Sequence, residues 1–143
     1  MIGDCVVDAS VLAALFVNDH HTLSVRTMFE ALAEDDDLIF YAPDVVYYET
    51  LGVLRKHELR FNYPTFFEDV RFLAEIPLNV TPARDLLIEA ADICSTYLIS
   101  SYDAFYLALS QRLRIPLVTA DARLIGATRG KGFDVRFIAD VLN

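Results

Sequence analysis

Short apolar segments alternate with longer segments of helical periodicity along this chain, and this alternation restricts the fold more than any other feature. Residues 5–8, 38–42, 78–81, 116–120 and 133–138 are the segments expected to form strands. Short buried strands that alternate with helices are typical of a mainly parallel sheet with right-handed crossovers and helices on both faces. We therefore expect an α/β fold of three layers, α/β/α, with the last strand at an edge.

The segments between the strands have apolar residues at helical spacing. Helices are expected over 9–17, 21–37, 44–60, 61–76, 82–99 and 100–114, with a further short helix after residue 120. Pro43 should stop the second strand, and Pro64 should open the helix over 61–76, because proline suits a first helical turn. No repeat or linker interrupts the pattern, so residues 1–143 are interpreted as a single domain.

The composition is apolar for a globular domain, with 55% hydrophobic residues and a mean hydropathy of +0.35. The longest apolar stretch is interrupted by Asp92 and Asp103, so it is not a membrane span. No secretory signal is recognisable, and a cytoplasmic protein is expected. Cys5 and Cys94 match neither a zinc spacing nor a thioredoxin-type pair and are interpreted as small core residues. The excess of apolar residues indicates an interface with a partner or a second copy.

The net charge of −9 argues against binding to nucleic acid by electrostatics alone. The charge is uneven, however: residues 1–111 carry a net charge of −12, and residues 112–143 carry +3. The basic C-terminal quarter could therefore still contact the phosphates of a nucleic acid.

Two of the expected strands end on an acid, Asp8 in DCVVDAS and Asp121 in IPLVTADA. In open α/β sheets, ligands bind outside the carboxyl ends of the strands, where both acids should lie. Each acid is also suited to cap the helix that follows it, so either one alone has an ordinary structural explanation.

Two further acids lie on helical segments. Asp103 belongs to a capping box with Ser100, yet its neighbours on the helix are apolar. Glu49 lies too far into its helix to cap it, and we expect it to share an inward face with Val45 and Val53. A surface position remains the alternative for Glu49. Because clustered carboxylates repel, four of them at one site need a cation, and oxygen ligands without His or Cys suit Mg²⁺ or Mn²⁺.

Four segments together resemble the motifs of PIN-domain nucleases, most closely the toxin ribonucleases of VapC type. They are VVDAS at 6–10, YYETLGVLRK at 47–56, SSYDAFYLALS at 100–110 and PLVTADARL at 116–124. The resemblance covers essentially the whole chain in the family's order. It implies that the acidic quartet consists of Asp8, Glu49, Asp103 and Asp121, with the hydroxyl residues Ser10 and Thr119 supporting it.

The resemblance implies a metal-dependent endoribonuclease that hydrolyses RNA phosphodiester bonds, as the toxin of a toxin–antitoxin pair. Asp8, Asp103 and Asp121 would be metal ligands, and Glu49 a ligand or a water-orienting base. The family also implies a homodimer and a cognate antitoxin. Phosphate contacts are expected from the basic residues of the C-terminal part, with ordinary solvation as the alternative; these are Arg112, Arg114, Arg123, Arg129 and Lys131.

The segment 61–72 carries four Phe and one Tyr, which is more typical of a core helix than of an interface. Because the family uses this region near its antitoxin and dimer contacts, an interface is the second hypothesis. Two rival functions also remain open. One is a non-catalytic binding protein of the same fold, and the other is a receiver-type phosphorylation domain, although Ala9 and Ser10 follow Asp8 where a receiver needs another acid.

Overall fold

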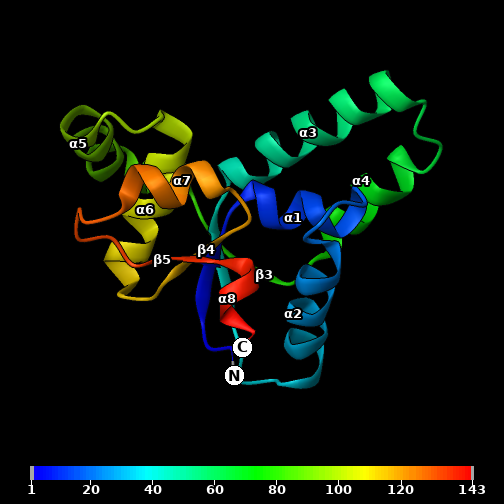
Figure 1. Cartoon of the computed structure of the whole chain (residues 1–143), viewed down its shortest axis with the longest axis horizontal. Coiled ribbons are helices and arrows are strands. Elements are labelled where there is room, and N and C mark those ends of the chain that lie inside the picture. The colour runs from blue at the N-terminus through cyan, green and yellow to red at the C-terminus, as the bar shows by residue number, and fades with distance from the viewer. Residues whose placement is uncertain (1, 143) are drawn as a thin grey trace.

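The computed structural model describes residues 2–142, in which five strands form a single parallel sheet (Figure 1). The strands are β1 (Cys5–Val7), β2 (Phe40–Pro43), β3 (Leu78–Thr81), β4 (Leu117–Thr119) and β5 (Val135–Phe137). Their order across the sheet is β3-β2-β1-β4-β5, and all four pairs of neighbours are parallel. The expected α/β fold is confirmed, including an edge position for the last strand.

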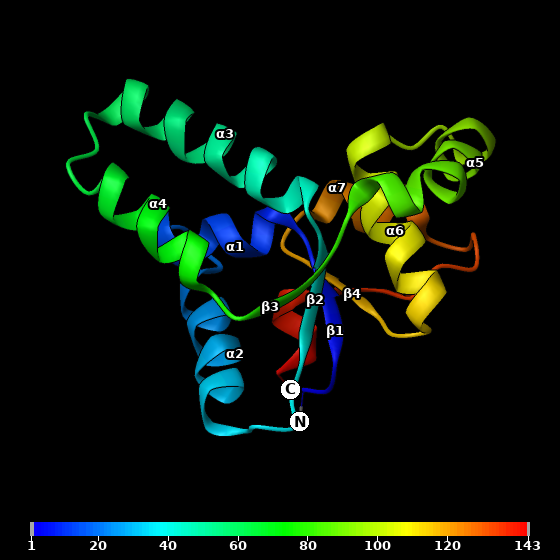
Figure 2. The same cartoon turned by 180° about the vertical axis from the view of Figure 1, so that it is seen from behind.

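Helices cover both faces of this sheet (Figures 1 and 2). They are α1 (Ala9–Phe16), α2 (Thr22–Glu34), α3 (Val45–Phe61), α4 (Phe66–Glu75), the 3₁₀ turn η1 (Ala83–Leu86), α5 (Leu87–Tyr97), α6 (Ser101–Leu113), α7 (Ala122–Thr128) and α8 (Ile138–Val141). Helix α6 packs on β1, β2 and β4 and against α5, while α1 packs against α2 and α3. Helices α3 and α4 extend from the body as a hairpin, which we call the α3–α4 arm.

The connections reverse direction between β1 and β4. From β1 the chain crosses to β2 and then β3 on one side of the sheet, and it then returns to β4 and β5 on the other side. With right-handed crossovers, these two series of helices cover opposite faces. The carboxyl ends of β1 and β4 therefore lie side by side at the point where the helices diverge, which is where open α/β sheets form a crevice.

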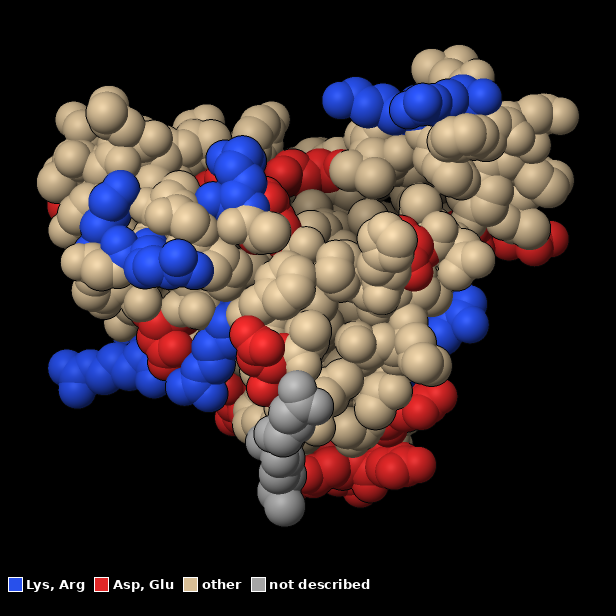
Figure 3. All heavy atoms as spheres, viewed as in Figure 1, with Lys and Arg blue, Asp and Glu red and all other residues tan. Residues whose placement is uncertain are grey.

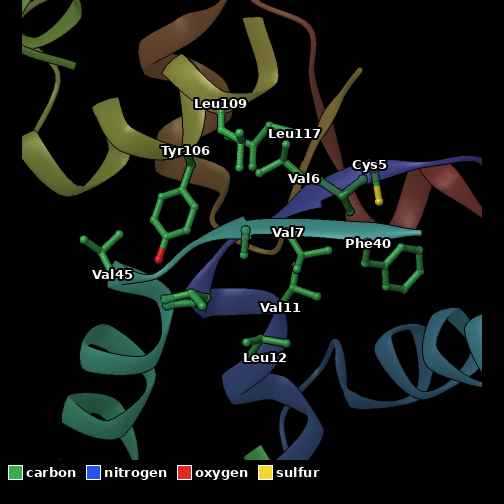
Figure 4. Packing of buried hydrophobic residues seen from close by; sticks show 14 of the residues in the cluster. Cys5, Val6, Val7, Val11, Leu12, Phe40, Val45, Tyr106, Leu109 and Leu117 are labelled. Atoms are coloured by element: carbon green, nitrogen blue, oxygen red, sulfur yellow. The ribbon is translucent and has the colours of Figure 1, made fainter. Parts of the chain in front are cut away.

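The core is centred on the middle strand β1 and its neighbour β4, whose residues are all buried. Val6, Leu117 and Leu109 pack together between the sheet and α6, and Phe40 extends the cluster along β2 (Figure 4). The edge strands β3 and β5 are only partly buried. The interpretation of Cys5 as a core residue is confirmed, whereas Cys94 is only partly buried.

The expected position of Pro64 in a first helical turn is wrong. Helix α3 runs on to Phe61 and ends at Asn62, whose left-handed φ of 50° is tolerated by asparagine. Helix α4 begins only at Phe66, so Pro64 lies in the connection. β2 ends at Pro43 as expected, with Pro43 as its last residue, where β2 pairs only with β3 and no bond to β1 is lost.

Two further helices differ from the expected helix boundaries. The expected helix 82–99 is divided into η1 and α5, and the short helix α8 follows β5 where none was expected. Within the described residues, no helix combines the length and the apolar character that crossing a bilayer requires.

Candidate active site

Asp8 and Asp121 follow β1 and its neighbour β4, and both lie at the point where the connections reverse. Asp8 follows β1 and caps α1, accepting a hydrogen bond from Val11 N at 3.2 Å. Asp121 comes two residues after β4 and caps α7, accepting from Arg123 N at 2.9 Å. The capping role is therefore real for both acids. It does not exclude a site, because each cap uses only one of the two carboxylate oxygens.

Asp8 is the most deeply buried acid of this region, with 4% of its surface exposed. Ser10 Oγ donates to Asp8 Oδ1 at 2.5 Å, and Thr119 Oγ1 donates to Asp8 Oδ2. Burial raises the pKa of Asp8 to about 6, against the hydrogen bonds, which lower it. No ion pair to Asp8 exists among residues 2–142. A buried carboxylate without a cation is costly, which makes Asp8 a position where a cation would be stabilising.

The two hydroxyl residues connect Asp8 to the segment after β4. Ser10 Oγ accepts from Ala120 N at 2.9 Å, and Thr119 Oγ1 accepts from Asp121 N at 3.0 Å. The two hydroxyl oxygens lie 3.2 Å apart. Because each hydroxyl donates to Asp8 and accepts from the backbone, the carboxylate has one orientation relative to Asp121.

Asp103 enters the pocket from the first turn of α6, where Ser100 Oγ caps the helix by accepting from Asp103 N. Its neighbours Ile99 and Tyr106 are buried, as the sequence predicted. Arg123 Nη2 lies 3.2 Å from Asp103 Oδ2 and 3.0 Å from Asp121 Oδ2. One guanidinium nitrogen thus joins two of the four acids.

Glu49 approaches from the N-terminal part of α3 and is half-buried. The buried residues of α3 are Val45, Val46, Thr50 and Leu54, so the expected inward face of Glu49 is confirmed at Val45 and wrong at Val53, which is 42% exposed. Glu49 nevertheless faces inward because α3 begins beside the carboxyl end of the sheet. Its orientation thus depends on where the helix begins.

Tyr106 is a site residue that sequence reasoning treated only as an apolar neighbour. Its hydroxyl donates to Glu49 Oε1 at 2.7 Å, and its ring is 1% exposed in the core (Figure 4). Burial raises the pKa of Glu49, the hydrogen bond from Tyr106 lowers it, and Asp103 raises it. Burial and the negative charge of Glu49 raise the pKa of Tyr106, which therefore stays a donor. The spacing of Asp103 and Tyr106, one turn apart, is the signal that would have indicated this role.

All four acids line one small cavity of about 160 Å³. Its other lining residues are Ala9, Ser10, Ser100, Tyr102, Tyr106 and Arg123. Three larger hollows among the described residues, of about 400, 420 and 320 Å³, lie elsewhere and are lined mainly by apolar residues. The acidic cavity is therefore distinguished by its chemistry and not by its size.

The donor set of this cavity suits a hard divalent cation, because it offers carboxylate and hydroxyl oxygens without His or Cys. However, no three His, Cys, Asp or Glu side chains within residues 2–142 are already arranged to hold a metal ion. The acids share a pocket, but Asp103 and Asp121 are bonded to Arg123. Their roles as metal ligands stay predictions.

The basic residues expected to contact RNA have different surroundings. Arg123 lines the cavity, while Arg112 bonds Glu89 Oε2 at 2.6 Å and the Asp85 carbonyl at 2.7 Å. The other three end helices or follow them: Arg114 and Arg129 are the C-caps of α6 and α7, and Lys131 bonds the Ala127 carbonyl. Figure 3 shows basic side chains over the part of the molecule that carries α6 and α7, next to acidic side chains near the centre of this face.

The fold and site together define an α/β domain with a carboxylate-lined pocket where the strand connections reverse. The family model described as "PIN domain" matches residues 5–129, and the chain belongs to this family. The resemblance seen in the sequence is thereby confirmed. The strand order also excludes the receiver-type alternative, because receiver domains have the order 2-1-3-4-5.

Solved structures of toxin–antitoxin proteins share the fold. A toxin–antitoxin complex from Klebsiella pneumoniae has a TM-score of 0.67 at 16% identity, covering 94% of this chain and 97% of that chain. The sarcin-ricin loop cleaving toxin VapC20 from Mycobacterium tuberculosis has a TM-score of 0.67 at 19% identity, covering 90% and 95%. VapBC2 from Rickettsia felis, bound to a promoter DNA fragment, has a TM-score of 0.68 at 11% identity, covering 94% and 98%. No curated protein matches the sequence.

Proposed function

We propose that this chain is a metal-dependent endoribonuclease that acts as the toxin of a toxin–antitoxin pair. The observation that carries the proposal is the convergence of Asp8, Glu49, Asp103 and Asp121 on one cavity. Asp8 adds weight, because it is buried without a cationic partner among the described residues. Membership of the PIN domain family and the toxin–antitoxin folds of the neighbours support the same activity.

In this proposal the four acids bind Mg²⁺ or Mn²⁺. A divalent ion there would lower the pKa of a bound water and offset negative charge on the scissile phosphate. Ser10 and Thr119 hold Asp8 in one orientation, and Tyr106 holds Glu49. With both acids oriented, Glu49 is available as a ligand or as the group that orients the attacking water.

RNA is proposed as the substrate, and it would approach over α6 and α7. The acidic remainder of the chain repels phosphate, so the basic C-terminal quarter is the favoured route to the cavity. Arg123 at the cavity, with Arg114, Arg129 and Lys131 beyond it, would contact phosphates. Arg112 is the weakest of these assignments, because it is already bonded to Glu89 and Asp85.

An antitoxin is proposed to bind the α3–α4 arm, on which large apolar side chains are exposed. Phe61, Phe67 and Phe72 are 59%, 74% and 57% exposed, so the expectation of a core helix is wrong for these side chains. A hollow of about 320 Å³ lies between the two helices of the arm, lined by Tyr47, Leu51, Val70, Leu73 and Ala74. An amphipathic helix of a partner is suited to such a groove. A homodimer and a cytoplasmic location complete the proposal.

The test is RNA cleavage by the purified protein with Mg²⁺ or Mn²⁺, with excess EDTA, and after Asp8→Asn or Asp103→Asn. Cleavage should require the metal and fall by at least about 100-fold in each variant, since losing even a residue that only orients a metal ligand costs about 10–100-fold. Circular dichroism establishes that the variants fold. Equal cleavage in EDTA would overturn the assignment, and no cleavage at all would favour a non-catalytic binding protein of this fold.

A further inference from the structure

Arg123 bonds two of the four acids of the site, Asp103 and Asp121. Its Nη2 atom donates to Asp103 Oδ2 at 3.2 Å and to Asp121 Oδ2 at 3.0 Å. We propose that Arg123 is an internal counter-ion that competes with the divalent metal for Asp103 and Asp121. This inference rests on the proposed function. It adds that a residue of the same chain lowers the affinity of the site for the metal.

The geometry of the pair supports competition. Asp103 comes from the first turn of α6 and Asp121 from the segment after β4, yet both direct an oxygen at the same nitrogen. Two carboxylates that converge on one positive group form a position for a cation, and a metal ion would use the same oxygens. The guanidinium and the metal therefore cannot both hold these oxygens.

The arginine is placed to leave this position easily. The side chain of Arg123 is 67% exposed, whereas those of Asp103 and Asp121 are 12% and 32% exposed. Exposed ion pairs are worth little, about 0–1 kcal/mol each, because water and salt screen them. The guanidinium can swing into solvent while the acids stay, and the Arg123 backbone remains bonded to Asp121 Oδ1.

Arg123 bonds only Asp103 and Asp121, and not the other two acids of the pocket. Asp8 is held by Ser10 and Thr119, and Glu49 is held by Tyr106, so these acids need no arginine for their orientation. In the metal-free protein Arg123 offsets the repulsion between Asp103 and Asp121. The consequence is a pocket that is stable without metal and binds metal less tightly than its four acids would allow.

The experiment is a calorimetric titration of Mn²⁺ into the full chain without RNA, comparing wild type with Arg123→Ala, Arg123→Lys and Arg136→Ala. Arg136 is a matched control, because it also bonds an acid two residues before it, Asp134, outside the cavity. Arg123→Ala should bind Mn²⁺ about three- to tenfold more tightly, as expected for the loss of one or two exposed ion pairs. Arg123→Lys should be intermediate, and Arg136→Ala should match wild type.

Thermal unfolding in EDTA gives a second readout. Arg123→Ala should unfold at a lower temperature than wild type in EDTA, because the paired acids lose their cation, and saturating Mn²⁺ should remove this difference. If Arg123→Ala does not fold, Arg123→Gln takes its place.

The outcomes separate this inference from the proposed function. Equal or weaker Mn²⁺ binding by the folded Arg123 variants would overturn the competition and leave the metal site standing. Absence of Mn²⁺ binding by every protein, or binding unaffected by Asp103→Asn, would overturn both.

Discussion

Thr119 Oγ1 donates a hydrogen bond to Asp8 Oδ2, joining the last residue of β4 to the residue that follows β1. The two residues lie 111 positions apart in the chain. The bond exists because β1 and β4 are neighbours in register, with Val7 opposite Val118. It orients a carboxylate at the point where the helices diverge.

Replacing Thr119 by valine keeps the shape of the side chain but removes the hydroxyl. Asp8 then loses a donor and the Asp121 backbone N–H loses an acceptor. We expect RNA cleavage to fall by about 10–100-fold, as for other residues that orient a metal ligand. The free energy of unfolding should fall by about 1–3 kcal/mol, the usual cost of a buried polar group left unpaired. Thr128→Val is the control, because Thr128 is equally buried but bonds Leu124 and Ile125 carbonyls on α7; equal cleavage by both variants would contradict the role of Thr119.

The stability of the metal-free protein should depend on the ionisation of Asp8. Its pKa is raised from 3.8 to about 6 on folding, so the folded state binds this proton more tightly than the unfolded state. The contribution is fully present below about pH 4 and is lost as the pH rises to about 6, a change of up to about 3 kcal/mol. Urea unfolding in EDTA at pH 4 and pH 7.5 should show a larger loss in wild type than in Asp8→Asn, because Glu49 and Asp69, whose pKa values are also raised, titrate in both proteins. A loss of the same size in both proteins would contradict the role of Asp8.

Removing the hydroxyl of Tyr106 should change the pH profile of cleavage. The hydrogen bond from Tyr106 lowers the pKa of Glu49, so Tyr106→Phe should raise that pKa. Because ionised Glu49 is the active form in the proposal, the acid limb of the profile should move to higher pH. Tyr63→Phe is the control, since the Tyr63 hydroxyl bonds the distant Phe16 carbonyl. A lower rate with an unchanged profile would indicate that Tyr106 acts only through packing.

The basic residues after α7 should contribute to RNA affinity without sequence preference. Each phosphate contact to a single strand contributes about 0.7 to the slope of log K against log salt, so Arg129→Ala with Lys131→Ala should reduce the slope by about 1.4. Binding of a single-stranded RNA by the cleavage-deficient Asp8→Asn protein over a salt series measures it. Arg26→Ala on α2 serves as the control, and an unchanged slope in the double variant would mean that RNA does not follow this surface.

The exposed aromatic side chains of the α3–α4 arm should matter for partner binding and not for folding. Phe67 is 74% exposed, so Phe67→Ser should change the free energy of unfolding by less than about 0.5 kcal/mol. If the arm binds the antitoxin, this variant should no longer co-purify with the co-expressed product of the adjacent reading frame. Leu23→Ser, at a 78% exposed position on α2, should retain it. If both variants still co-purify with the partner, the arm is not part of the interface.

Local patterns in the sequence predicted most of the elements and all four acids of the pocket. Asp8 and Asp121 were identifiable because strands end and helices begin within a few residues of each other, and capping is a local interaction. Ser100 and Asp103 were identifiable for the same reason. The helix after Pro64 was misplaced because the left-handed Asn62 sets where α3 ends, and periodicity does not reveal such a residue.

The sequence by itself determined that strands and helices alternate, that acids follow the strands, and that the chain resembles PIN domains. The tertiary structure alone decided that β1 and β4 are neighbours, that Tyr106 reaches Glu49, and that Arg123 joins Asp103 to Asp121. The physical reason is the range of the interactions. Capping and periodicity act within a few residues, whereas contacts between side chains from different elements depend on the order of the strands and on where each helix begins.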